Sequence, residues 1–354
     1  MPTAARATRY ELDRSGWSEL LAQEPRFRLE QIWNGLYHQG RDLSDLTVLP
    51  KDLRAALTDA APLALSEVTE SESDGGDTVK FLWELDGGAR VETVLMHYAD
   101  RSTVCVSTQA GCAMACSFCA TGQAGFERNL SVGEIVEQLA RARLHASRGT
   151  AQRRVSNVVF MGMGEPLANY DATWGAIRRI HADMEIGARH LTVSTVGLVP
   201  GILRMAAEDL PVSLAVSLHA ADDVLRDELV PINRKYPIAE LMSACRQYTE
   251  ATRRRISFEW ALIDGVNDSF TDAQRLADLA RPLRAHVNLI PLNPTPGFGV
   301  LGSSRNRVHA FRGELERNGV NATVRDTRGT EIDAACGQLR AGHQATPVRR
   351  PRRR

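Results

Sequence analysis

Long apolar runs are missing from this sequence. Its 354 residues contain no uncharged apolar stretch of about 18 residues, the length that a membrane-spanning helix needs. The first residues also lack the apolar segment of a signal peptide. We therefore expect a cytoplasmic protein that has no membrane partner.

An excess of charge is absent as well, because 43 basic residues balance 43 acidic ones. Overall charge thus gives no argument for a nucleic-acid partner. Lysine accounts for only three of the basic residues, and arginine for the other 40. A GC-rich genome explains this bias, although arginine also suits contacts to phosphates and stacked bases. Arginines cluster at residues 153–154, 253–255 and 349–354, and we expect residues 341–354 to form a disordered tail.

Cysteine is sparse too. Six cysteines are too few for a disulfide scaffold and favour a reducing compartment. With 43% hydrophobic and 24% charged residues, the chain can build a sizeable core, which excludes disorder as its dominant state. Three of the six cysteines nevertheless lie within one stretch of eight residues. Such crowding in a cysteine-poor chain indicates a local chemical site.

The first 63 residues are predicted to be helical. Apolar and aromatic side chains between residues 19 and 37 follow helical spacing, which favours a buried face. From residue 64 the apolar positions alternate instead, with strands expected at residues 64–69, 78–85 and 90–98 and Asp-Gly-Gly turns between them. We therefore predict a helical accessory domain at residues 1–63 and a β extension at residues 64–100.

From about residue 101 strands and helices alternate. Strands are predicted at residues 103–108, 155–161, 191–195, 212–218, 256–262, 287–292 and 322–325. Helices between them include residues 132–147, 172–184, 238–252, 272–283 and 305–318. Six such units predict an α/β core at residues 101–340 with a parallel sheet, either a barrel or a doubly wound fold. Its chemically distinctive residues follow the carboxyl ends of strands, where barrel enzymes place their sites.

Cys112, Cys116 and Cys119 lie on the loop after the first of these strands, with the spacing C-x3-C-x2-C. Three thiolates on one loop can converge on a metal centre, but a structural zinc normally has four protein ligands. A [4Fe–4S] cluster held by three cysteines explains the missing ligand, since one iron stays open for another molecule. Zinc with a remote fourth ligand and three unrelated thiols are the alternatives.

Other candidate residues also follow predicted strands. The glycines of residues 162–166 allow the backbone to approach a ligand closely, and the Glu165 carboxylate suits an ammonium group. Ser194, Ser217, His219 and Asn293 sit at further strand ends. Taken singly, these polar side chains could instead cap loops, and a lone histidine is usually structural.

Glu92 shares a face of its strand with Val94 and Met96. A carboxylate on an apolar face is costly unless it is paired or used. If the strand were turned over, Glu92 would face solvent, and the residues alone leave both possibilities open.

The remaining cysteines have less local support. Cys105 lies on the first strand of the core, Cys336 lies far downstream and Cys245 lies within a predicted helix. Taken alone, each of these cysteines is expected to be a small buried hydrophobe. Residues 330–333, just before Cys336, resemble a capping box with Asp333 as its acid.

Several segments occur in the order found in one known family: residues 160–171, 217–219, 229–234, 287–294 and 332–339. Together with the cysteine loop, they resemble the RlmN family of the radical S-adenosylmethionine (SAM) superfamily, over residues 12–340. The resemblance implies a partial (β/α)6 barrel with an N-terminal helical domain and a small β-hairpin extension. It also implies that the three cysteines are ligands of a [4Fe–4S] cluster that binds SAM.

The resemblance further implies an activity and a set of SAM contacts. RlmN proteins methylate carbon 2 of adenosine in 23S rRNA and in tRNA, and they need a reducing electron donor such as flavodoxin or ferredoxin. We expect this chain to act in the same way as a monomer. The implied SAM contacts are Gly164, Glu165, Ser194, Ser217, Leu218, His219 and Asn293.

Three residues receive catalytic roles from the same resemblance. Cys336 is methylated by one SAM, and a second SAM, cleaved by one electron from the cluster, activates that methyl group so that it joins carbon 2. Glu92 accepts the proton from carbon 2. Cys105 then attacks the sulfur of Cys336, forming a disulfide and releasing the RNA. Cys245 has no such role and is expected in the core.

Arg26, Arg28 and Arg41 in the N-terminal region form an RNA-docking surface by analogy with the family, or an ordinary exposed arginine surface. Two alternative functions remain. The sister family of the same superfamily methylates carbon 8 of the rRNA adenosine and confers antibiotic resistance. A non-catalytic iron–sulfur protein that binds RNA or senses redox state belongs to a different class.

Overall fold

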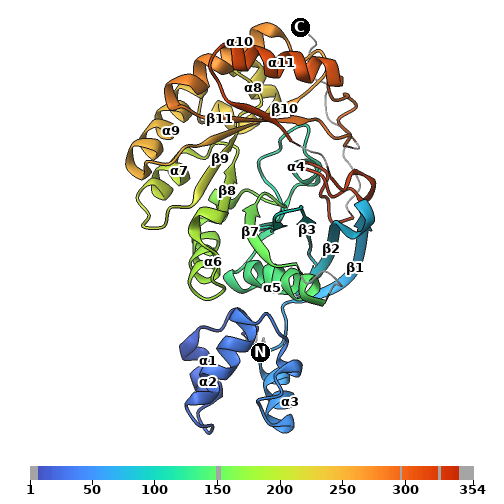
Figure 1. The fold of residues 1–354 in the computed structure, drawn as a ribbon, viewed down its shortest axis with the longest axis vertical. Helices are drawn as coiled ribbons and strands as arrows, with labels where there is room; N and C mark the ends of the chain where they lie inside the picture. The colour runs from blue at the N-terminus through green and yellow to red at the C-terminus, as the bar shows by residue number, and fades with distance from the viewer. Residues whose placement is uncertain (1–6, 149–152, 296, 326–327, 343–354) are drawn as a thin grey trace.

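One curved sheet organises the molecule (Figure 1). The computed structural model describes residues 7–148, 153–295, 297–325 and 328–342. Ten strands form the sheet in the order β1-β2-β3-β4-β7-β8-β9-β10-β11-β12. The strands are β1 Leu65–Ser73, β2 Thr78–Leu85, β3 Arg90–His97, β4 Ser102–Cys105, β7 Val155–Phe160, β8 Leu191–Thr195, β9 Ser213–Ser217, β10 Ser257–Leu262, β11 His286–Pro291 and β12 Ala322–Val324.

The strand order decides between the two predicted architectures. From β4 to β12 each strand of this sheet pairs in parallel with the sheet's next strand along the chain, and β5 and β6 form a separate sheet. A doubly wound fold would reverse this order at a switch point, and no reversal occurs here. In the part of the chain that the structure describes, β12 does not pair with β1. The sheet is therefore an open, partial barrel, as predicted.

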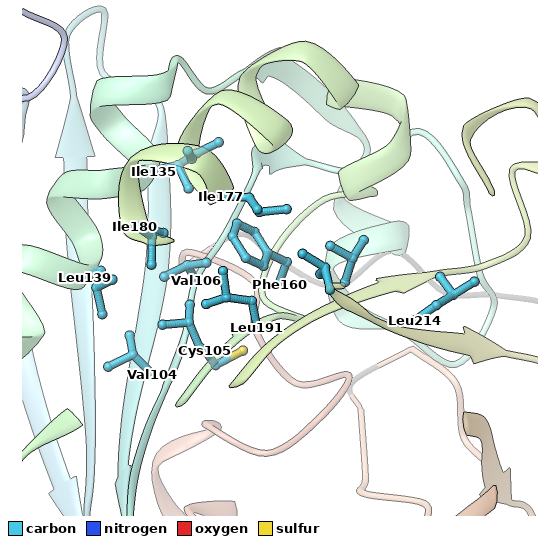
Figure 2. Packing of buried hydrophobic residues seen from close by; sticks show 14 of the residues in the cluster. Val104, Cys105, Val106, Ile135, Leu139, Phe160, Ile177, Ile180, Leu191 and Leu214 are labelled. Carbon is cyan, nitrogen blue, oxygen red and sulfur yellow. The ribbon is translucent and has the colours of Figure 1, made fainter. Parts of the chain in front are cut away.

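Helices cover the convex side of the sheet, as βα units require (Figure 1). They are α5 Val132–Arg148, α6 Tyr170–Ala182, α7 Val199–Ala206, α9 Ile238–Thr252, α10 Phe270–Ala280 and α11 Arg305–Arg317. Ile135 and Leu139 of α5 and Ile177 and Ile180 of α6 pack on buried side chains of the sheet (Figure 2). One such contact residue is Phe160 at the end of β7, which is fully buried.

The N-terminal helices form a lobe below α5 and α6 in Figure 1. They are α1 Arg14–Leu20, α2 Phe27–Trp33 and α3 Lys51–Ala60. Trp33, Leu36 and Tyr37 are buried, which confirms this part of the predicted apolar face, whereas Leu20 and Phe27 are exposed. The Arg143 side chain of α5 donates hydrogen bonds to the Tyr37 and His38 carbonyls, so the lobe is tied to the barrel. The proposed division into separate domains stays a prediction.

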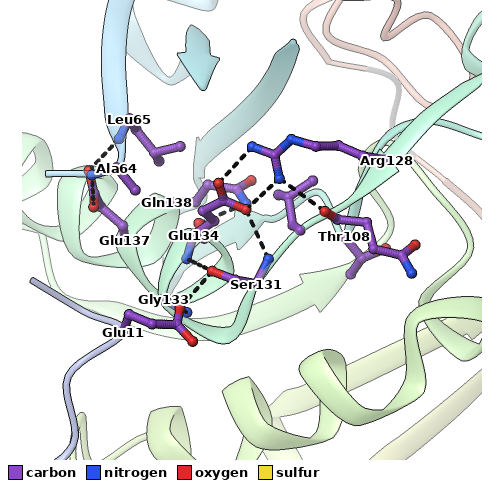
Figure 3. A network of polar contacts seen from close by, with 12 residues as sticks. Glu11, Ala64, Leu65, Thr108, Arg128, Ser131, Gly133, Glu134, Glu137 and Gln138 are labelled. Atoms are coloured by element: carbon purple, nitrogen blue, oxygen red, sulfur yellow. Dashed lines mark hydrogen bonds and ion pairs between the residues drawn. The ribbon is translucent and has the colours of Figure 1, made fainter. Parts of the chain in front are cut away.

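Two helix starts show how side chains anchor the barrel helices. At the start of α5, the Ser131 hydroxyl accepts from the Glu134 N–H and the Glu134 carboxylate accepts from the Ser131 N–H (Figure 3). Ser269 and Asp272 form a second capping box at the start of α10. Both satisfy N–H groups that a helix leaves unpaired.

The capping box predicted at residues 330–333 is wrong. Thr330–Ile332 is a single 3-10 turn whose N-cap is Gly329, without a side-chain cap. Asp333 has a left-handed φ of 52°, and its carboxylate accepts from Arg340 instead. The short spacing matched the motif, but no helix follows it.

Residues at the C-terminal end are buried further than expected. Ala341, the first residue of the predicted tail, is only 2% exposed, so the chain is still part of the core one residue beyond the predicted end of the α/β core. The arginine cluster at residues 349–354 lies outside the described residues. No described helix is both long enough and apolar enough to cross a membrane.

Candidate functional site

Two adjoining cavities lie at the carboxyl ends of the parallel strands. The first, about 150 Å³, is named the SAM cavity here because most residues predicted to contact SAM line it. These are Gly164, Glu165, Ser194, Ser217, His219 and Asn293, together with Cys116 and Cys119. The second, about 90 Å³, is named the thiol cavity because Cys105 and Cys336 both line it. Cys336 lines both cavities, so the predicted SAM site and thiol pair adjoin.

The cysteine loop is held between a small hairpin and a short helix. Strands β5 Gln109–Gly111 and β6 Phe126–Asn129 pair around it, and Cys119 is the N-cap of α4 Ala120–Ala124. Sequence reasoning missed this hairpin because each strand is only three or four residues long. The Phe118 ring packs edge-on against the His219 ring at 4.7 Å, which joins the loop to the end of β9.

The loop fits a cluster better than a single zinc ion. Two sulfurs on one zinc lie at most about 4.6 Å apart, since each bond is about 2.3 Å. Among the described residues, Glu70, Glu72 and His145 are the only group of three whose ligand atoms all lie within 4.8 Å of one another, so the three cysteine sulfurs are spread more widely than that. Burial raises the pKa of Cys112 to about 12, so binding as thiolates requires compensating positive charge. Iron atoms of a cluster would supply that charge.

The glycines of the loop after β7 allow close packing against another segment of the protein. A Cβ on Gly164, whose φ is 101°, would lie 2.6 Å from the Gln109 Cβ. A Cβ on Gly162 would lie 2.7 Å from the Val106 carbonyl oxygen. Gly162 and Gly164 therefore let this loop pack on residues 106–109, and both also line the SAM cavity, where the predicted approach to a ligand stays a prediction.

Glu165 is buried at the edge of the SAM cavity, with 2% of its surface exposed. Its carboxylate accepts hydrogen bonds from the N–H groups of Leu167, at 3.0 Å, and Val196, at 2.9 Å. Burial raises its pKa to about 7, against the opposing effect of these hydrogen bonds. A ligand cation in the cavity would favour the ionised carboxylate. Glu165 therefore both caps a loop and offers negative charge to a ligand.

His219 has a defined hydrogen-bonding state. The Ala261 N–H donates to its Nδ1 at 2.9 Å, so the ring proton lies on Nε2. Burial lowers the pKa of His219 to about 3, which keeps the ring neutral. Its φ of 58° is unusual for a residue other than glycine and is typical of functional sites. His219 can thus donate from Nε2 to a ligand.

Leu218 departs from the prediction. Its side chain is fully buried in the hydrophobic core and does not line the SAM cavity. Its carbonyl accepts from the Arg226 side chain at 3.0 Å. Arg226, which sequence reasoning missed, also donates to the Val196 carbonyl and so braces two neighbouring loops.

The Cys336 segment is fastened over the cavities. The Asn293 amide donates to the Cys336 carbonyl at 3.1 Å, and the Ala120 N–H donates to the Gly337 carbonyl at 2.8 Å. All six cysteines are free thiols, so the predicted disulfide between Cys105 and Cys336 is not present. Cys245 is fully buried within α9, which confirms its placement in the core.

Arg325 is a buried cation that sequence reasoning missed. It lines both the SAM cavity and the thiol cavity. The nearby Cys336 thiol raises the pKa of Arg325, and Arg325 in turn opposes the burial that raises the pKa of Cys105 to about 12. The sequence placed Arg325 at the end of a predicted strand, but no local pattern distinguished it from the other 39 arginines.

Glu92 is buried and paired, but it does not line the thiol cavity. Its Oε1 lies 2.9 Å from the Lys80 Nζ, and its Oε2 accepts from the N–H groups of Arg340 and Ala341. Val94 and Met96, on the same face of β3, do line the cavity. The structure therefore places Glu92 next to the cavity, beneath the C-terminal segment. The sequence analysis did not identify Lys80, one of only three lysines, as the partner of Glu92.

Comparison with known proteins agrees with this arrangement. The model of the Radical SAM superfamily matches residues 106–277. A Parafrankia sp. (strain EAN1pec) protein named "Probable dual-specificity RNA methyltransferase RlmN" is 54% identical over 333 residues, covering 90% of this chain and 86% of that protein. The protein of the same name from Chloroflexus aurantiacus is 51% identical and covers 96% of this chain and 94% of its own.

This chain belongs to the RlmN family. A solved radical SAM methyltransferase from Sphaerobacter thermophilus has the same fold, with a TM-score of 0.90, 51% identity and coverage of 95% of this chain and 99% of that one. The chain is accordingly an RlmN-type radical SAM enzyme. The cysteine loop and the SAM cavity fit the cluster and SAM that this superfamily uses.

Proposed function

We propose that this RlmN-type enzyme methylates carbon 2 of adenosine in 23S rRNA and in tRNA. The observation that carries the proposal is that Cys105 and Cys336 line one cavity, and that Cys336 also faces the predicted SAM site. Carbon 2 of adenine is electron-poor and has no lone pair. A simple displacement by carbon 2 on SAM is therefore ineffective, and a protein thiol is needed to present the methyl carbon.

Cys112, Cys116 and Cys119 would hold the cluster, and Glu165 with the Nε2–H of His219 would orient SAM. When bound, the cluster and SAM together supply both a methyl group and one-electron chemistry that removes hydrogen from a methyl carbon.

Cys336 acts as the carrier in the proposed sequence. Its sulfur accepts a methyl group, and after loss of one hydrogen atom the carbon forms a bond to carbon 2 of adenine. Protein and RNA are then joined through a thioether at Cys336. The adduct loses one electron, which the cluster held by the three cysteines would accept, and Glu92 accepts the proton from carbon 2.

The Glu92 step needs a local opening. Its carboxylate is held by Lys80 and by the N–H groups of Arg340 and Ala341. Release of the two N–H groups would free one carboxylate oxygen toward the neighbouring cavity.

Cys105 completes the sequence. Its thiolate attacks the sulfur of Cys336, and a Cys105–Cys336 disulfide forms as the sulfur–carbon bond to the RNA breaks. The electron pair of that bond leaves with the methylene carbon, which takes up a proton and becomes the methyl group on carbon 2. Arg325, beside both thiols, stabilises the thiolate form. A cellular reductant then restores the thiols, and a donor such as flavodoxin or ferredoxin supplies the electrons. We propose that the protein acts as a monomer in the cytoplasm.

The decisive experiment is trapping of the adduct. Purified Cys105→Ala protein should contain RNA joined covalently to Cys336, detectable by denaturing gel and by mass spectrometry of the nuclease-treated peptide. A variant that still turns over and contains no covalent RNA would refute the role of Cys105. Cys245→Ala is the matched control, because Cys245 is buried away from both cavities.

Mass analysis of nucleosides decides the position of methylation. We expect 2-methyladenosine in rRNA and tRNA treated with the enzyme. Recovery of 8-methyladenosine would assign the chain to the carbon-8 activity instead, since that sister family shares the cluster and both thiols.

A further inference from the structure

An arginine precedes five of the seven parallel strands. Arg101, Arg154, Arg189, Arg255 and Arg284 stand one or two residues before β4, β7, β8, β10 and β11. Because these strands are parallel and neighbours, their amino ends meet at the same end of the barrel. All five side chains are exposed. We name this set the arginine rim.

The positive charge of the rim is largely uncompensated. Among the described residues, only Arg101 of the five forms an ion pair, with its neighbour Asp100. The acids that precede β9, Glu208 and Asp209, are both paired with Arg178. A chain of zero net charge thus concentrates free cations at one end of its barrel. Clustered charge of one sign at a cavity mouth attracts and steers a polyanion.

A cavity of about 490 Å³ opens at the same end, and Arg101 and Arg255 lie at its mouth. We name it the amino-end cavity. Short polar side chains from the first halves of the strands line it: Thr103, Asn157, Thr192, Ser213, Ser257, Asn288 and Thr323. A closed barrel fills this region with branched apolar side chains. Here the polar lining leaves a hollow within the size range of ligand pockets.

The amino-end cavity leads to the proposed reaction centre. Met161 and Arg325 line both this cavity and the thiol cavity, and Glu259 lines both this cavity and the SAM cavity. Glu259 is 4% exposed, and its Oε2 has no hydrogen-bond partner among the described residues. A buried acceptor without a donor is costly, so it favours a ligand that carries an amino or hydroxyl group.

We propose that the arginine rim and the amino-end cavity form the RNA entrance of this enzyme. RNA phosphates bind to the rim, and an unstacked nucleotide passes through the cavity toward Cys105 and Cys336. Enzymes that act on a base commonly take it out of the stack in this way, and arginine suits phosphate binding. This inference rests on the proposed function, since it names the route to the same site.

An acidic electron-donor protein is the competing occupant of a basic surface. The cysteine loop, however, lies at the carboxyl ends of the strands, whereas the rim lies at their amino ends. A donor on the rim would therefore be separated from the cluster by the length of the barrel. The position of the rim favours RNA.

The test compares two double charge reversals. The rim variant is Arg255→Glu/Arg284→Glu, and the control is Arg246→Glu/Arg305→Glu. Arg246 lies on α9 and Arg305 at the start of α11; both are exposed, and neither forms an ion pair with a described residue. Binding of a fluorescent RNA hairpin with adenosine in its loop is measured by anisotropy over a series of salt concentrations. We expect the rim variant to bind at least about tenfold more weakly, with a salt slope smaller by about 2, and the control to match the wild type.

Further readouts separate the possible failures. Methylation is assayed with dithionite, so that no donor protein is needed, and SAM binding should be the same in all three proteins. If the rim variant binds the hairpin as tightly as the wild type, or if both variants weaken equally, the RNA entrance is refuted. A rim defect that appears only with a protein donor would assign the rim to that donor. If the wild type shows rim-dependent binding but methylates no adenosine, the entrance stands and the proposed function fails.

Discussion

Glu165 couples ligand binding to pH. Its pKa is raised to about 7 by burial, so the carboxyl group is largely protonated at pH 6 and largely ionised at pH 7.5. A bound ammonium group favours the ionised form, so the affinity for SAM should rise with pH through this range. We expect SAM to bind about eightfold more weakly at pH 6.0 than at pH 7.5. Calorimetric titration of the holoenzyme at both pH values measures this difference.

Glu165→Gln is the control for this prediction. Its amide cannot ionise, so its SAM affinity should be lower than that of the wild type at pH 7.5 and should change little with pH. A wild-type affinity that does not change with pH would contradict the contact between Glu165 and the SAM ammonium.

Arg325 controls the reactivity of the thiol pair. Without its charge, only a backbone hydrogen bond at Met161 opposes the burial that already raises the pKa of Cys105 to about 12. In Arg325→Met the final attack by Cys105 should therefore slow by tenfold or more, and protein–RNA adduct should accumulate as in Cys105→Ala. Quantifying adduct against time on denaturing gels measures this effect.

Two comparisons make the Arg325 prediction specific. Arg325→Lys should restore much of the release rate, because it keeps the charge. A higher pH should speed release in Arg325→Met but not in Cys105→Ala. Full turnover of Arg325→Met without adduct would show that the guanidinium does not act on the thiols.

The loop after β7 depends on one close contact between elements. Alanine at position 164 would place a Cβ 2.7 Å from the Gln109 backbone nitrogen in a left-handed conformation. We expect Gly164→Ala to lower the free energy of unfolding by more than about 2 kcal/mol and to weaken SAM binding. Gly313→Ala on α11 is the control, since its Cβ would meet no atom within 4 Å. Anaerobic urea unfolding compares them, and equal stability of the two variants would disprove the contact.

The Lys80–Glu92 pair joins β2 to β3. Lys80 lies opposite Val94, so Glu92 is its diagonal neighbour, within reach of a long side chain. Lys80→Met leaves a buried carboxylate without its cation and should cost about 3–5 kcal/mol of stability. Lys80→Met/Glu92→Gln should be more stable than Lys80→Met, because the amide carries no charge. Unfolding of the wild type, Lys80→Met, Glu92→Gln and the double variant measures the coupling free energy between the two side chains. Additive effects of the two single changes would contradict the pairing.

On the scale of the whole molecule, residues 328–342 lie along the open side of the barrel, near β1 and β2 (Figure 1). Leu339 and Ala341 are buried, and the Ala341 N–H binds Glu92. A chain ending at Gln338 should therefore unfold several degrees below a chain ending at Gly342. Both should still bind SAM, because the lining of the SAM cavity ends at Gly337. Anaerobic thermal unfolding tests this, and equal midpoints would show that the segment does not close the barrel.

Local patterns predicted much of this molecule. The strand periodicity over residues 155–161 and 191–195 corresponds to β7 Val155–Phe160 and β8 Leu191–Thr195, because buried strands need apolar side chains wherever they lie. The hairpin β5–β6 and the turn at residues 330–333 were missed or mistaken. Both make contacts with distant segments: the Gln109 side chain of β5 accepts from the Glu165 N–H, and the Asp333 carbonyl accepts from the Lys80 side chain.

The sequence by itself determined the chemistry that this protein can offer: three cysteines on one loop, two further thiols and a single carboxylate in a glycine-rich loop. Residue type and spacing are properties of the chain and survive any arrangement of its elements. Only the tertiary structure decided which groups meet. It paired Glu92 with Lys80, set Arg325 beside Cys105 and Cys336, and brought five separated arginines to one end of the barrel. Distances between side chains far apart in sequence depend on how the sheet curves, and no local pattern records that.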